Sequence, residues 1–312
     1  VVFNDGAVGA VTGATATSLT VTFSIKPKTA GSLTAVVTTD AQSSGAAVQV
    51  ATIMPVVTTR TVSLAASAAT FTFNGFGFDP TAAHNTVVLN DGAVGTVTAA
   101  SATSLTVTFS TKPTAVGNLT AVVTTNSVSS GAAVQVATVA PAVTVSTASQ
   151  SVNTTTVTIN GAGFDTTPGN NTVVFNDGAV GTVTAATATS LTVTFSTQPT
   201  TGGKLTAVVT TNSVSSGAAI QVAAVAPIVT SNTASQSIAA TTVTISGVGF
   251  DAIAGHNTVV FSNGAVGTVT AATATSLTVT FSTKPKTTGN LTAVVTTNSV
   301  SSGVAVQVAT VI

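Results

Sequence analysis

Residues 156–164 read Thr-Val-Thr-Ile-Asn-Gly-Ala-Gly-Phe. The apolar Val157 and Ile159 alternate with threonine, and this period of two predicts a half-buried β-strand. Gly161 and Gly163 follow, and glycine adopts backbone conformations that other residues avoid. The stretch therefore predicts a strand that runs into a glycine turn.

The surrounding sequence continues the same alternation. The expected strands are residues 142–145, 156–159, 172–175, 180–184, 191–195, 205–210 and 218–222. Asn176-Asp177-Gly178 predicts a turn that tolerates positive φ, and no segment has a helical period. About seven short strands separated by turns are typical of an immunoglobulin-like β-sandwich. The fold class is therefore all-β.

The whole pattern returns every 86 residues, which predicts a tandem array of similar units. The segments that mark each copy begin at Phe3, Leu89, Phe175 and Phe261. The predicted domains are an incomplete unit at 1–54 and three complete units at 55–140, 141–226 and 227–312. The incomplete unit lacks the counterpart of 55–86. We expect these residues to be part of a longer repetitive chain. The alternative is that a neighbouring chain supplies the missing strands.

The glycine turn and the strand after it resemble the IPT/TIG family of immunoglobulin-like domains. The matching segments are 71–78 with 85–90, 156–164 with 171–176, and 243–250 with 257–263. In bacteria such repeats are usual on secreted and surface proteins, so the resemblance implies an extracellular or cell-surface location. Members that contact DNA use basic loops, which have no match here. The repeats are also nearly identical and poor in charge, which favours a repetitive structural role.

Composition excludes several classes of protein. Charged residues are 4% of the 312, against about 25% in typical domains, and the net charge is zero. No broad positive field therefore attracts nucleic acid. The mean hydropathy is +0.60, yet the apolar runs are far shorter than the roughly 20 residues of a membrane-spanning helix. Cysteine is absent, which excludes disulfides, thiolate metal sites and cysteine nucleophiles.

Glycine and aspartate motifs are the first candidate sites. We interpret two sets of residues as structural turns. The glycine-turn set is Gly75, Gly77, Gly161, Gly163, Gly247 and Gly249; the Asn-Asp-Gly set is Asp91, Gly92, Asp177 and Gly178. A phosphate-binding loop is disfavoured, since a third glycine and a following helix are missing. The last repeat carries Asn263 where the others carry Asp, which fits turn chemistry rather than an obligatory charge.

The loop after the glycine turn offers the only metal candidates, Asp79, Asp165 and Asp251. Carboxylate and amide oxygens could bind Ca²⁺ there. Each repeat supplies one carboxylate, and a nearby position alternates between histidine and Asn170. A turn residue that bonds its own backbone is the preferred interpretation, so no metal or other cofactor is expected.

Catalysis is not expected either. The two histidines, His84 and His256, occupy equivalent loops of different repeats, and no nucleophile–base arrangement is visible. A Lys–Asn isopeptide bond is disfavoured because Lys112, Lys204 and Lys284 do not share one aligned position. Glycosylation sequons begin at Asn118, Asn153, Asn170 and Asn290.

The predicted function is a filament, sheath or surface stalk formed by packing of neutral Thr/Val/Ala-rich surfaces. The expected partners are copies of the chain itself, with glycans on Thr, Ser or Asn as an option. Contacts between uncharged faces should depend little on salt. The alternative is the stalk of a cell-surface adhesin or carbohydrate-binding protein.

Overall fold

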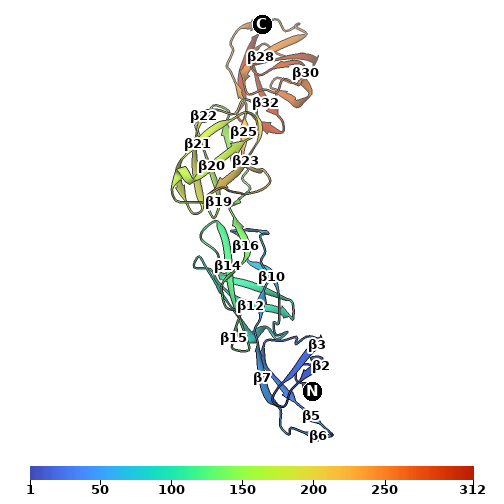
Figure 1. Cartoon of the computed structure of the whole chain (residues 1–312). Helices are drawn as coiled ribbons and strands as arrows, with labels where there is room; N and C mark the ends of the chain where they lie inside the picture. The colour runs from blue at the N-terminus through green and yellow to red at the C-terminus, as the bar shows by residue number, and fades with distance from the viewer. The chain divides into compact units, whose positions relative to one another are not determined.

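A computed structural model describes all 312 residues, which divide into two compact units, 1–140 and 141–312 (Figure 1). Both units consist of β-strands and turns. The helices are three single 3-10 turns, η1 (Ala82–His84), η2 (Pro168–Asn170) and η3 (Ala254–His256). None of them has the length and apolar character needed to cross a membrane.

Residues 141–226 form a sandwich of two sheets. Its strands are β17 (Ala142–Val143), β18 (Ser149–Ser151), β19 (Thr156–Ala162), β20 (Asn171–Phe175), β21 (Val180–Thr187), β22 (Ser190–Thr197), β23 (Gly203–Thr211), β24 (Val214–Ser215) and β25 (Ile220–Ala226). One sheet has the order β17-β19-β22-β21 and the other β18-β25-β23-β20, with β24 paired to β23. All pairs are antiparallel except β18 with β25. This order confirms the immunoglobulin-like sandwich.

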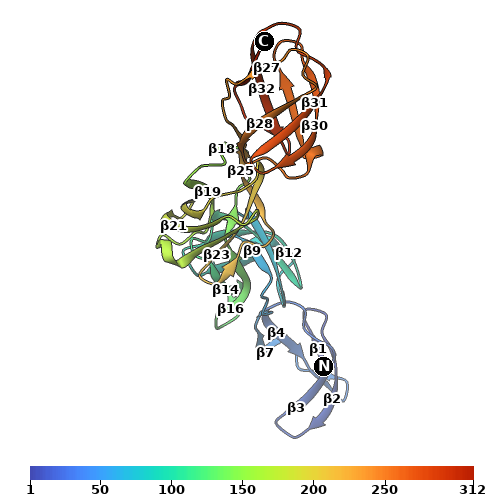
Figure 2. The ribbon, with the colours of Figure 1, turned by 90° about the horizontal axis from the view of Figure 1, so that it is seen from above.

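The two other complete repeats have the same strand order. In 55–140 the strands are β8 (Val56–Val57), β9 (Ser63–Ala65), β10 (Thr70–Phe76), β11 (Asn85–Leu89), β12 (Val94–Ser101), β13 (Ser104–Thr111), β14 (Gly117–Thr125), β15 (Val128–Ser129) and β16 (Val134–Ala140). In 227–312 they are β26 (Ile228–Val229), β27 (Ser235–Gln236), β28 (Thr242–Val248), β29 (Asn257–Phe261), β30 (Val266–Thr273), β31 (Ser276–Thr283), β32 (Gly289–Thr297), β33 (Val300–Ser301) and β34 (Val306–Val311). Figure 2 shows β28, β30 and β31 of the last repeat as one layer.

The first repeat has fewer strands. They are β1 (Val2–Phe3), β2 (Val8–Ala14), β3 (Leu19–Ile25), β4 (Gly31–Val36), β5 (Thr38–Thr39), β6 (Gln42–Ser43) and β7 (Val48–Ile53). A three-stranded sheet of order β1-β4-β7 faces the β2–β3 ribbon, and no counterpart of β10 covers that ribbon (Figure 2).

Cross-strand pairing places the alternating apolar side chains of neighbouring strands opposite one another. In β19 the apolar Val157 and Ile159 lie opposite Val193 and Leu191 of β22. All four side chains are buried in one core cluster. Between them Thr158 faces outward with the other threonines, so each strand has one apolar and one polar face.

The structure adds detail that the sequence pattern did not predict. Strands β18 and β24 were not expected, since one is a polar Ser-Gln-Ser segment and the other has two residues. Gly161 lies inside β19 rather than in the turn. A Cβ atom there would overlap the carbonyl oxygen of Ala142 and the ring of Phe164, so only glycine fits. The turn itself begins at Gly163, whose φ is 75°. Gly75 and Gly247 repeat the first role, and Gly77 and Gly249 repeat the second.

Candidate functional site

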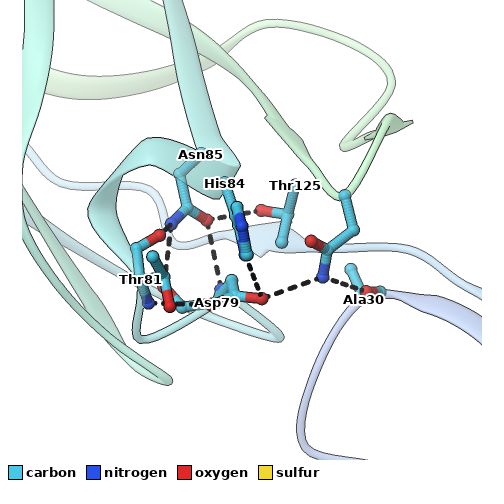
Figure 3. A network of polar contacts seen from close by, with 7 residues as sticks. Ala30, Asp79, Thr81, His84, Asn85 and Thr125 are labelled. Atoms are coloured by element: carbon cyan, nitrogen blue, oxygen red, sulfur yellow. Dashed lines mark hydrogen bonds and ion pairs between the residues drawn. The ribbon is translucent and has the colours of Figure 1, made fainter.

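The loop between the glycine turn and the next strand holds a network of hydrogen bonds around Asp79 (Figure 3). Oδ1 of Asp79 accepts the backbone N–H of Thr81 at 2.7 Å. Its Oδ2 lies 3.1 Å from Nδ1 of His84 and accepts Nδ2 of Asn126 at 3.1 Å. The carboxylate therefore closes an Asx turn and ties it to the turn between β14 and β15.

A buried asparagine supports this loop from beneath. Asn85 is 4% exposed. Its Oδ1 accepts the N–H of Asp79 and the hydroxyl of Thr125, while its Nδ2 donates to the carbonyls of Asp79 and Thr81. Every polar atom of this buried amide is thus bonded, as burial requires. Sequence reasoning did not single out Asn85, although its recurrence as Asn171 and Asn257 before each Thr-Val-Val segment was a usable signal.

Asp165 and Asp251 repeat the arrangement. Their carboxylates accept backbone N–H groups of Thr167 and Ile253, each at 2.8 Å. Nδ2 of Asn212 and Nδ2 of Asn298 each donate to the respective Oδ2 at 3.0 Å. Asn170 replaces the histidine in the middle of the three complete repeats, and the Asx turn persists there. The histidine is therefore dispensable for the turn.

Hydrogen bonds to the ionised carboxylates lower their pKa values. The Thr81 backbone N–H is the main cause for Asp79, whose pKa falls to about 2 although partial burial opposes the shift. The pKa values of Asp165 and Asp251 are also lowered, chiefly by the N–H groups of Thr167 and Ile253. The carboxylates are therefore held as anions, and they accept hydrogen bonds from backbone N–H groups.

This arrangement suits a structural turn. Both oxygens of Asp79 already accept N–H donors. The side chain of His84 pairs with this carboxylate at 3.1 Å. The network can therefore fix the backbone geometry of this loop.

The Asn-Asp-Gly turns perform a different task. Asp177 has a φ of 58° and Gly178 one of 68°, the positive values that this turn needs. Oδ2 of Asp177 accepts the backbone N–H groups of Thr200 and Thr201, each at 2.8 Å. Asp91 bonds the N–H of Ala115 at 2.6 Å in the same manner. These aspartates therefore hold the loop that connects β22 to β23, or β13 to β14.

The repeat at 141–226 matches a family of known domains. A model described as the IPT/TIG domain matches residues 141–222. A comparison with curated proteins gives no match. Similar solved structures include invasin, a bacterial integrin-binding protein, at 13% identity and a TM-score of 0.28 over 98% of this chain and 70% of that chain. A Bacteroides ovatus protein, SGBP-B of a mixed-linkage glucan utilization locus, has 19% identity and a TM-score of 0.22 over 84% of this chain and 69% of that chain.

Domains 4–9 of the surface layer protein SbsC are also similar, at 18% identity and a TM-score of 0.20 over 83% of this chain and 47% of that chain. Likenesses at this level bear on no activity or ligand. The family match covers one repeat, and the neighbouring complete repeats share its sequence and strand order. Residues 141–222 therefore match an IPT/TIG domain, and the chain as a whole is a tandem array of immunoglobulin-like repeats.

Proposed function

We propose that the chain is a non-catalytic structural segment of an extracellular or cell-surface fibre or stalk, and that copies of it associate side by side. The observation that carries the proposal is an exposed valine that recurs with the 86-residue period. Its exposed fraction is 70% at Val2, 68% at Val88, 70% at Val174 and 69% at Val260. A second exposed set follows six residues later and comprises Val8, Val94, Val180 and Val266.

In the complete repeats the first set of valines lies on edge strands. β11, β20 and β29 each end the order of their sheet, so one side of each strand has no β-partner. Edge strands of folded domains usually carry charges, proline or bulges that block further pairing. These strands read Asn-Thr-Val-Val-Leu or Asn-Thr-Val-Val-Phe, and their ladders contain no register shift. They are therefore open to pairing.

The neighbouring edge is guarded in a different way. β12 ends the other sheet, and its ladder with β13 shifts register twice, after Val94 and after Val97. Such bulges twist an edge away from a partner. This contrast selects β11, β20 and β29 as the pairing strands.

The 86-residue period indicates which partner would pair with these edge strands. A surface repeated every 86 residues matches a partner with the same repeat, and a second copy of this chain has it. The strands carry no charge, so the association should persist when salt is raised. Glycans on exposed Asn, Thr or Ser side chains would restrict which faces can meet.

Lysine substitutions at the edge test this proposal. A triple variant, Val88→Lys with Val174→Lys and Val260→Lys, places a charge on each open edge strand. A matched control, Ala133→Lys with Ala219→Lys and Ala305→Lys, adds the same charge at exposed loop positions. We expect sedimentation velocity to show assemblies for the wild type and the control and monomers for the edge variant. Assemblies of equal size for both variants, or a monomeric wild type, would contradict lateral association through these strands.

A further inference from the structure

We infer that the two aspartate motifs are the two halves of a docking joint between the two repeats of each compact unit. One half is a docking loop, residues 28–30 or 200–202, held by the aspartate of the Asn-Asp-Gly turn. The other half is a docking turn on the following repeat, made of Gly77, Asp79 and Asn126 or of Gly249, Asp251 and Asn298. The partner of each docking turn is thus the loop of the repeat that precedes it.

The docking loop is pre-shaped within its own repeat. Oδ2 of Asp5 accepts the backbone N–H groups of Lys28 and Thr29 at 2.6 and 2.9 Å. These bonds leave the peptide groups of the next residue, Ala30, free to face the second repeat. Ala30 is 2% exposed, so it is buried although it belongs to a loop.

The docking turn binds both polar groups of that residue. The N–H of Ala30 donates to the carbonyl of Gly77 at 2.8 Å. The carbonyl of Ala30 accepts Nδ2 of Asn126 at 3.0 Å, and the same Nδ2 donates to Oδ2 of Asp79 (Figure 3). The Asp79 carboxylate therefore orients the carboxamide that holds the preceding repeat.

The second unit contains an independent copy of the joint. Gly202 donates its N–H to the carbonyl of Gly249 at 2.7 Å. Its carbonyl accepts Nδ2 of Asn298 at 3.0 Å, and Asn298 also donates to Asp251. The residues at the loop position differ, alanine in one joint and glycine in the other. The joint therefore recognises backbone and does not depend on that side chain.

The residues of the docking turn are of types that tolerate its backbone geometry. Asn126 and Asn298 have φ values of 49° and 48°, a region that asparagine tolerates better than most residues. Gly249 has a φ of 83°, and a Cβ atom there would lie 3.1 Å from Cγ2 of Val152 in the preceding repeat. The joint is thus packed as well as hydrogen-bonded, which should restrict bending between the two repeats.

Amide hydrogen exchange measured by NMR tests the joint in the full chain. The N–H groups of Ala30 and Gly202 are the backbone donors that cross each joint, so both should be protected. Asn298→Asp keeps the backbone preference but replaces the donating NH₂ by a carboxylate that repels Asp251. We expect the Gly202 amide to exchange at least about tenfold faster in this variant, since a hydrogen bond is lost and a like charge is added. Ala30, in the other unit, should be unchanged.

The matched control is Asn212→Asp, because Nδ2 of Asn212 donates to Oδ2 of Asp165 inside one repeat, and Asn212 lies at the opposite end of β23 from Gly202. This variant should leave Gly202 protected, and the amides of β23 and β32 report whether either variant disturbs the fold. An unprotected Gly202 amide in the wild type, or equal exchange at Gly202 in the wild type and Asn298→Asp, would overturn the inference. Exchange concerns the monomer at low concentration, so its outcome is separate from the test of lateral association.

Discussion

The first and second repeats share most of their sequence from Phe3 and Leu89 onward but differ in how well their cores are covered. Leu19 is 41% exposed, whereas its counterpart Leu105 is fully buried. Val50 is 57% exposed, and its counterpart Val136 is 1% exposed. The difference arises because β8, β9 and β10 cover the second repeat and have no equivalent in the first. The alternation of apolar and polar residues is therefore sufficient to form the β2–β3 ribbon. The apolar face of such a ribbon becomes a buried core only where strands such as β8, β9 and β10 cover it.

The uncovered face of the first repeat is a groove of about 850 Å³. Phe3, Leu19, Val21 and Leu33 are among its lining residues. In the second repeat the space corresponding to this groove is filled by side chains such as Phe71 and Phe73 of β10. The groove of the first repeat therefore corresponds in position to β10 of the second repeat.

The largest effect is expected from adding to the first repeat a copy of the strands that cover the second. A chain with a copy of residues 55–86 placed before Val1 should bury Leu19, Val21 and Val50. Each fully buried side chain of this kind contributes about 1.5–3 kcal/mol, so the first repeat should gain several kcal/mol. Residue-resolved NMR during urea titration measures this gain, which far-ultraviolet circular dichroism can support. Unchanged amide protection in β3 would show that the first repeat does not take the immunoglobulin-like core.

The next largest effect compares two leucines. Leu105→Ala should destabilise the second repeat by about 2–5 kcal/mol, because it leaves a cavity in a closed core. Leu19→Ala removes a side chain that is already partly in water, so the loss in the first repeat should be well below that range. The same urea titration, read separately in each repeat, gives both numbers. Equal losses at the two positions would mean that the first core is also closed.

A smaller effect should separate two strand glycines. A Cβ atom at Gly95 would overlap Cγ1 of Val107, which is fully buried and has no room to move. At Gly9 the neighbour is Val21, which borders the open groove. Gly95→Ala should therefore cost about 1–3 kcal/mol, the usual range for overpacking, and Gly9→Ala less. Thermal unfolding followed by NMR measures both, and a larger cost at Gly9 would contradict the account of the groove.

The smallest effect concerns pH in the complete repeats. Asp79 has a lowered pKa in the folded chain, about 2 against an ordinary value of 3.8, mainly because it bonds the Thr81 N–H. A depressed folded pKa stabilises the loop above the unfolded pKa, and the stabilisation is lost as pH falls from about 4 toward 2. The ¹³C shift of the Asp79 carboxyl should titrate near pH 2, whereas a midpoint near 4 would show that the network is absent. Asp79→Asn serves as the control that removes the titration.

Much of the fold could be predicted because it depends on local pattern. Val157 and Ile159 show their strand by alternation, and the 86-residue period places every copy. The pattern could not show that Gly161 belongs to a strand, since its need for glycine comes from Ala142 and Phe164 in space. β18 was missed because Ser149–Ser151 has no apolar alternation and owes its pairing to β25.

The docking joint could not be predicted from the sequence either, because its contacts join residues that are far apart in the chain. Asn126 bonds Ala30, which lies 96 positions earlier, so no local motif connects them. One signal was present: Asn126, Asn212 and Asn298 recur, while the first repeat carries Asp40 at that position. Only the structure shows that the recurring asparagine follows β14 and lies beside Asp79.

The central claim is that neutral repeats associate through uncharged edges, and sedimentation of the full chain in low and high salt tests it most directly. Raising the salt from about 0.01 M to about 1 M shortens the screening length from roughly 30 to 3 Å, which weakens ionic contacts and leaves apolar and backbone contacts in place. We expect assemblies of the same size at both concentrations. Assemblies that dissociate in high salt, or a chain that is monomeric in both, would contradict the account.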